Sequence, residues 1–205
     1  YFHAVPAGKS VLELPHGRAL AQRGRQSDMA MNAAALAGRC GERRRAREYR
    51  ELCRRIFEGE RAHYAGFDFE DNNENTGWFI YDDIMWWTIS LARAYAAFGD
   101  EEYLRLSEQS FSRVWYGSER VGDTGSYDET DGGMFWRWYP ISNPEPNRPG
   151  DGKMACINFP AAVAALTLAG CVPEGRTEPT GERPVTHTRE RYFEMGREIY
   201  EWGVE

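Results

Sequence analysis

The chain has 205 residues and a mass of 23.5 kDa, which is enough for one ordinary domain with its own hydrophobic core. Its 25 basic and 32 acidic residues give a net charge of −7, so the chain lacks the basic excess typical of nucleic-acid-binding proteins. Charged residues at 28% and hydrophobic residues at 41% are close to globular averages, which argues against wholesale disorder.

The first quarter of the chain predicts an irregular segment followed by two helices. Residues 1–26 contain several prolines and glycines without a sustained period, and we expect them to be mostly irregular. Asp28 can cap a helix that runs to about Arg39. A second helix follows Gly41, with apolar residues at helical spacing and a solvated, arginine-rich face.

The clearest helical pattern lies in the middle of the chain. Apolar residues recur at helical spacing from Ile84 to Phe98, and Gly99 ends this stripe. Asp100 and the two glutamates after it suit the start of another helix, which continues to about Trp115. Because only about two residues join these helices, we expect an antiparallel helical hairpin.

The last third of the chain predicts a long loop and two more helices. Residues 117–152 are rich in Gly, Pro and Asp, with a possible strand pair near Phe135. Pro160 suits the first position of a helix. A terminal helix runs from Thr188 to Trp202. The predicted fold class is therefore all-α, with about six helices arranged as hairpins in one domain.

One apolar run could suggest a membrane-spanning helix, and the four cysteines could suggest a metal site, but neither interpretation holds. The uncharged run Met154–Val172 contains Pro160, and the helix after this proline is too short to cross a bilayer. The four cysteines show no CxxC spacing, and no paired histidines accompany them. We therefore expect neither a membrane-spanning segment nor a metal site.

Asp82 and Asp83 are the strongest candidates for chemistry. One of them could be the helix N-cap and the other a first-turn carboxylate that interacts with the helix dipole. However, large apolar residues flank the pair on both sides, from Trp78 to Tyr81 and from Met85 to Trp87. Burying two carboxylates among such groups is costly, which favours a functional role.

The chemistry that such a pair suits is glycoside hydrolysis. The chain is 14% aromatic, with seven Trp, which favours a surface that stacks on sugar rings. Adjacent aspartates can place their carboxyl groups about 5 Å apart, the separation that retaining glycosidases use. Mutual repulsion would separate their pKa values, so that one is an anionic nucleophile and the other a protonated acid.

Four ordered motifs also carry a resemblance to a known family. They are FIYDDIMWWTISLARAYAAFGDEEYL, DGGMFWRW, GKMACINFPAAVAAL and REIYEWG. Their order and spacing resemble glycoside hydrolase family 76, the endo-α-1,6-mannanases, over about Trp78 to Gly203. The resemblance implies an (α/α)6 barrel of about twelve helices. Six helices correspond to half to two-thirds of such a barrel, so we expect an excerpt of a longer protein or, if the chain is complete, exposed apolar helix faces.

The resemblance further implies retaining cleavage of α-1,6-mannosidic linkages, with Asp82 as the nucleophile and Asp83 as the general acid/base. It implies no metal or organic cofactor. The implied substrate-binding candidates are Trp78, Trp87, Asp131, Trp136, Trp138, Lys153 and Asn158.

Several of these candidates have a structural alternative. At least one of Trp136 and Trp138 could be a core residue, and Asn158 could simply cap the helix at Pro160. Lys153 could equally be a solvated cation.

Other functions remain open, among them those of other (α/α)6 enzymes such as uronyl hydrolases or sugar epimerases. The protein could be a mannan transglycosidase, in which a sugar hydroxyl replaces water, or a non-catalytic mannan-binding module. The expected partner is α-mannan or a manno-oligosaccharide, with no nucleic acid and no membrane-spanning segment. Since mannan is polymeric, we expect the protein to act outside the cytoplasm, in a secreted, periplasmic or cell-surface location.

Overall fold

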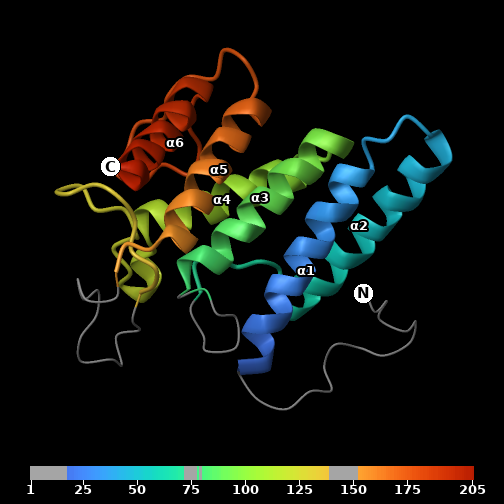
Figure 1. The fold of residues 1–205 in the computed structure, drawn as a ribbon, viewed down its shortest axis with the longest axis horizontal. Coiled ribbons are helices and arrows are strands. Elements are labelled where there is room, and N and C mark those ends of the chain that lie inside the picture. Colours follow the sequence, from blue (N-terminus) through green and yellow to red (C-terminus); the bar gives the residue numbers. More distant parts are fainter. Residues whose placement is uncertain (1–17, 72–77, 79, 139–151) are drawn as a thin grey trace.

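The computed structural model describes residues 18–71, 78, 80–138 and 152–205 (Figure 1). Within these ranges the chain forms six α-helices, one short 3-10 helix and no named strand, which confirms the predicted all-α class. The elements are α1 (Arg18–Ala37), α2 (Arg43–His63), α3 (Tyr81–Phe98), α4 (Glu101–Tyr116), η1 (Glu119–Val121), α5 (Ala155–Cys171) and α6 (Arg189–Val204).

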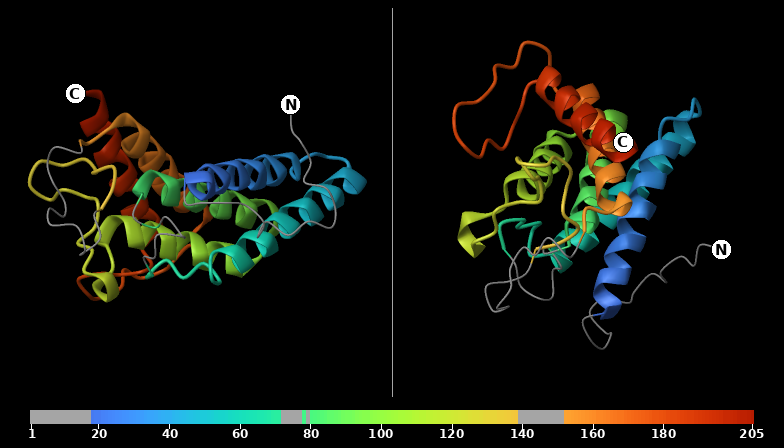
Figure 2. Two further views of the ribbon diagram at one scale, coloured as in Figure 1. Left: turned by 90° about the horizontal axis from the view of Figure 1, so that it is seen from below. Right: turned by 60° about the vertical axis from the view of Figure 1, so that its left-hand side comes forward.

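The helices form three hairpins in two layers. Helices α1, α3 and α5 pack side by side, and each packs with the helix that follows it, α2, α4 or α6 (Figures 1 and 2). We call α1, α3 and α5 the inner helices and α2, α4 and α6 the outer helices. Polar contacts show the relative direction of α1 and α3. Ser90 donates to the Asp28 carbonyl over 2.8 Å, and Arg93 donates to the Asn32 side chain over 3.0 Å, so α1 and α3 run parallel. Alternation of inner and outer helices is the plan of an α/α barrel.

This arrangement gathers particular chain segments at one end of the molecule. Since each outer helix runs antiparallel to its inner partner, the C-terminal ends of α2, α4 and α6 lie beside the N-terminal ends of α3 and α5 (Figure 1). The loop of residues 117–138 and residues 152–154 lie there as well. We call this region the α3 N-terminal end.

The hairpin of α3 and α4 forms as predicted. Gly99 follows α3 in the left-handed conformation, with φ of +71°, and its N–H donates to the Tyr95 carbonyl. Asp100 then caps α4 by accepting a hydrogen bond from the Glu102 N–H. The terminal helix begins in the same manner, because the Thr188 side chain accepts from the Arg191 N–H.

Two predicted helix starts were wrong. Helix α1 begins at Arg18, so residues 18–26 are helical, while residues 1–17 lie outside the described part of the chain. Asp28 is a buried residue inside α1, where its carbonyl is bonded to α3, and is not the cap. Helix α5 begins at Ala155 and contains Pro160 in its second turn. Asn158 supports this earlier start by donating to the Met154 carbonyl over 2.9 Å.

Apolar side chains are exposed on α5 and α6. Gly196 and Gly203 of α6 approach the side chains of Leu166 and Phe159 closely, so the two helices share this face. The exposed members are Phe159, Val163, Leu166, Phe193, Tyr200 and Val204. Among the helices that the structure describes, none is both long enough and apolar enough to span a membrane.

Candidate active site

Asp82 and Asp83 are the second and third residues of α3. The N-cap position belongs to Ile80, which forms no capping hydrogen bond through its side chain. The structural alternative, in which one aspartate is the N-cap, is therefore wrong, and both carboxylates lie in the first turn, where they interact favourably with the helix dipole. Only 8% of Asp82 is exposed, and Asp83 is half-buried. This pair is thus held at the edge of the core.

Trp136 makes a direct contact with this pair. Its indole Nε1–H donates to Asp82 Oδ1 over 3.0 Å. The backbone around Trp136 is bonded to the start of α3, because its carbonyl accepts from the Tyr81 N–H over 3.1 Å and Ile80 pairs with Arg137 in an antiparallel bridge. The segment around Trp136 therefore lies against Asp82, and one isolated bridge joins it to the residue before α3.

Asn158 organises the loop that carries this segment. Its Oδ1 accepts from the Met134 N–H over 2.8 Å, and its Nδ2 donates to the Met134 carbonyl over 3.1 Å. Met134 in turn forms an antiparallel bridge with Tyr127. The buried Asn158 amide thus pairs with both backbone polar groups of Met134, as a neighbouring strand would. Its amide is used in these bonds and is neither a helix N-cap nor open to a sugar.

The Gly132–Gly133 turn packs directly against a tryptophan of α6. Both glycines have positive φ, +68° and +72°. A Cβ at Gly133 would lie 2.6 Å from the Trp202 indole ring, so only glycine permits this approach. The turn therefore requires glycine, and its close neighbour is Trp202.

Lys153 is held by the same loop. Its Nζ lies 2.7 Å from Asp128 Oδ2, and it lies over the rings of Phe135 and Trp202 at 5.3 and 5.6 Å. The hydrogen bond from Lys153 lowers the pKa of the Asp128 carboxyl below its usual range. Asp131 lies in this turn too, where it is exposed and donates through its N–H to Asp128 Oδ1. Lys153 is therefore a paired cation within the loop.

Three of the predicted sugar-binding tryptophans are core residues. Trp78, Trp87 and Trp138 are almost completely buried. Trp78 packs against Tyr64 with ring centroids 4.8 Å apart, and the Arg113 guanidinium lies over Trp138 at 5.7 Å. Their faces are covered by protein, so these rings support the site from behind and do not form its surface.

A buried ion pair lies directly beneath the start of α3. Arg113 of α4 pairs with Asp123, and both side chains are fully buried. Asp123 also accepts from the Tyr81 hydroxyl over 2.5 Å. Burial, with the charge of Asp123, raises the pKa of Tyr81 well above its usual range. Sequence reasoning missed this group, because Asp123 lies in a glycine-rich loop and resembles an ordinary turn residue.

Carboxyl groups of α1, α2 and α3 act on the phenol of Tyr64, which follows α2. Burial raises the pKa of Tyr64, and the charges of Glu60, Asp28 and Asp83 raise it further, which places all three carboxyl groups near one phenol. Burial also raises the pKa of Glu60 itself. The C-terminal end of α2 thus contributes a buried carboxyl group, that of Glu60, whose charge acts on the same phenol as that of Asp83. Helical spacing alone carried no signal for this convergence.

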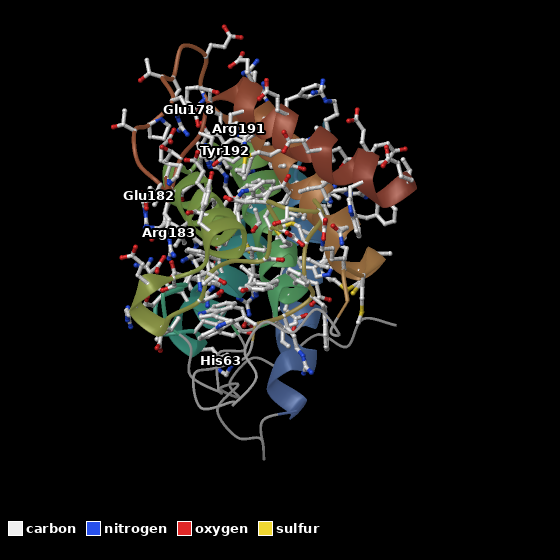
Figure 3. All side chains as sticks on the ribbon, turned by 90° about the vertical axis from the view of Figure 1, so that its left-hand side faces the viewer. His63, Glu178, Glu182, Arg183, Arg191 and Tyr192 are labelled. Carbon is white, nitrogen blue, oxygen red and sulfur yellow. The ribbon has the colours of Figure 1, made fainter. Side chains whose placement is uncertain are left out.

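A second polar cluster lies on the outer side of α4. Tyr192 donates to Glu108, which also pairs with Arg176, and the His187 ring lies 2.5 Å from Glu178. Figure 3 places Glu178 and Tyr192 together, far from His63 at the C-terminal end of α2.

A hollow of about 450 Å³ borders this cluster. It is lined by Glu101, Glu102, Leu104, Arg105, Glu108, Arg176, Val185 and Thr186. Since α4 is antiparallel to α3, this hollow lies toward the end of the hairpin away from Asp82, and it is separate from the candidate site.

The comparison with known families agrees with this geometry. A family model described as glycosyl hydrolase family 76 matches residues 26–204. The chain belongs to glycosyl hydrolase family 76. Membership in family 76 supports a glycoside hydrolase of the mannanase family in general. No curated protein matches the chain. Over the described ranges, no three His, Cys, Asp or Glu side chains of this family 76 chain are grouped to hold a metal ion.

Proposed function

We propose that the protein is a retaining glycoside hydrolase that cleaves α-1,6-mannosidic linkages in mannan, with Asp82 as the nucleophile and Asp83 as the acid/base. Family membership supports the reaction class and the general type of substrate. The observation that carries the assignment is the 3.0 Å hydrogen bond from the Trp136 indole to Asp82. An indole N–H can only donate, so it complements an ionised carboxylate, the form that a nucleophile requires.

The proposed reaction has two steps. In the first, a carboxylate oxygen of Asp82 attacks the anomeric carbon, and the bond from that carbon to the glycosidic oxygen breaks as Asp83 gives its proton to this oxygen. The product is a mannosyl ester of Asp82 and a released chain end. In the second step the ionised Asp83 takes a proton from water, the water oxygen attacks the anomeric carbon, and Asp82 leaves as a carboxylate.

Two features of the pair support different roles for the two acids. Asp82 accepts a hydrogen bond from a neutral donor and is nearly covered. Asp83 is more exposed than Asp82. An accessible carboxyl group can pass its proton to a glycosidic oxygen and take one from water, as an acid/base catalyst must.

The test uses unbranched α-1,6-mannan and compares the wild type with Asp82→Asn and Asp83→Asn. We expect oligosaccharide release by the wild type, a loss in both variants, and a first product with retained anomeric configuration by NMR. Asp100→Asn is the matched control, because it makes the same change at an exposed helix cap where Asn serves equally well. Activity that survives in both site variants would contradict the assignment.

The same experiment separates two alternatives. New, longer mannan chains formed when acceptor is added would indicate a transglycosidase. Binding of mannan without release of oligosaccharides by the wild type would indicate a binding module. The proposed substrate is an extracellular polymer, so we propose that the protein acts outside the cytoplasm. Detection of the protein in the cytoplasmic fraction alone would contradict this location.

A further inference from the structure

We propose that Trp136 is a positioning residue for Asp82, which fixes one carboxylate oxygen so that the other faces the anomeric carbon, and that it is not a sugar-stacking surface. This inference rests on the proposed function for its role in the reaction. The hydrogen bond between Nε1 and Oδ1, 3.0 Å long, is its starting point.

The backbone of Trp136 is held at both of its polar groups. Its carbonyl accepts from the Tyr81 N–H over 3.1 Å, and its N–H donates to the Gly152 carbonyl over 3.3 Å. Tyr81 precedes Asp82 in α3. The backbone of Trp136 is thus bonded to the residue beside the one whose carboxylate its indole contacts. The distance between indole and carboxylate is therefore set by main-chain bonds at the helix start.

One face and the polar edge of the Trp136 indole ring are already engaged. The Arg137 guanidinium lies over the ring, 5.0 Å from its centroid, and the polar edge of the ring is used on Asp82. A cation over the ring face is itself a favourable contact. A sugar would have to displace Arg137 to stack on that face, which favours a positioning role over a stacking role.

The chemistry of the indole group determines what this contact does. Because it donates and never accepts, its bond is strongest when Asp82 carries negative charge, and it favours the ionised form. In the first step that charge is lost to the ester, and in the second it returns as Asp82 leaves. The N–H therefore stabilises Asp82 as a leaving group, and its loss should slow the breakdown of the mannosyl-enzyme more than its formation.

The first test does not need activity. The indole ¹⁵N–¹H signal of Trp136, assigned by sequential NMR in the full chain, is followed from pH 7 to pH 3. We expect a pH-dependent shift that persists in Asp83→Asn and disappears in Asp82→Asn. A shift that survives unchanged in Asp82→Asn, or the absence of any shift in the wild type, would overturn the proposal.

The second test uses catalysis. In Trp136→Phe we expect kcat to fall by about a hundredfold with KM not raised, and the acid limb of kcat/KM to move to higher pH. Trp202→Phe is the control, because it also removes an indole N–H in the same region while leaving Asp82 and Trp136 in place; its acid limb should match the wild type. A rise in KM with an unmoved acid limb in Trp136→Phe would identify a stacking residue and overturn the proposal.

The two tests separate the inference from the proposed function. If the wild type does not cleave mannan, the proposed function fails, and the NMR titration still decides whether Trp136 holds the Asp82 carboxylate. If the wild type is active and the titration is absent, the proposed function stands and this inference fails.

Discussion

The Tyr81 hydroxyl donates a 2.5 Å hydrogen bond to Asp123 Oδ1, and this bond joins the first residue of α3 to the loop that follows α4. Asp123 also accepts from the Gly125 N–H over 2.8 Å and pairs with Arg113, which donates to the Phe69 carbonyl. Since Asp82 is the next residue of α3, the turn of helix that carries the aspartate pair is fixed from below by a buried charge network.

The first prediction concerns this network. Arg113→Met removes one member of a fully buried ion pair and leaves the Asp123 charge with only neutral partners, which should lower the free energy of unfolding by about 3–5 kcal/mol. Urea denaturation of the wild type and the variant measures this difference in the free energy of unfolding. Arg44→Met is the control, because the pair of Arg44 with Glu48 is exposed and should contribute less than about 1 kcal/mol. Equal effects of the two variants would contradict the prediction.

The second prediction concerns the Asn158 amide. In Asn158→Ala the Met134 N–H and carbonyl lose their side-chain partner, which should destabilise the protein by about 2–4 kcal/mol and weaken mannan cleavage. Asn158→Asp keeps the acceptor for the Met134 N–H but turns a charged oxygen toward two carbonyls. We therefore expect Asn158→Asp to be at least as destabilising by thermal denaturation. A nearly normal Asn158→Asp variant would show that the amide is not the link between loop and helix.

The third prediction uses two glycines with almost the same backbone. Gly133 and Gly99 have φ of +72° and +71°, but a Cβ at Gly133 would meet the Trp202 ring at 2.6 Å, while a Cβ at Gly99 would meet open space. Gly99→Ala should therefore cost about 1–2 kcal/mol from the backbone alone. Gly133→Ala should cost clearly more, and it should change the fluorescence of Trp202. Equal costs would show that the indole moves aside freely.

Much of the fold was predictable from local signals. The α3–α4 hairpin followed from an apolar stripe with a period of 3.6 residues, a glycine at the C-terminus and an acidic cap, and these signals act within a few residues of each other. The start of α5 was not predictable in this way. Pro160 is a strong local start signal, whereas the earlier start depends on Asn158, whose side chain bonds with Met134, in a distant loop.

In the candidate site, too, only the residues with a local sequence signal were predictable. Asp82 and Asp83 were identifiable because large apolar residues surround them in sequence. The groups around them were not, because separate hairpins must pack before Asp123 can bond to Tyr81 or the charges of Glu60 and Asp83 can act on Tyr64. The high aromatic content misled in one respect, because Trp78, Trp87 and Trp138 are almost completely buried core residues.

The last prediction concerns acid stability and the buried His187. Its ring lies 2.5 Å from Glu178 through Nδ1 and 3.1 Å from the Tyr116 hydroxyl through Nε2. A neutral ring that donates to Glu178 and accepts from Tyr116 satisfies both contacts. Burial lowers the pKa of His187 below its usual range of about 6.5, although the contact with Glu178 acts in the opposite direction.

The sign of the effect follows from proton binding. Between the lowered pKa of the folded state and about 6.5, the unfolded chain binds more protons at His187 than the folded chain does, so the free energy of unfolding falls as the pH falls through this window. One such group contributes at most about 1.4 kcal/mol per pH unit. His187→Asn should therefore lose less stability than the wild type between pH 7.5 and 5.5, measured by urea denaturation. If His187→Asn follows the wild-type curve, His187 is charged in the folded protein and the proposed neutral ring is wrong.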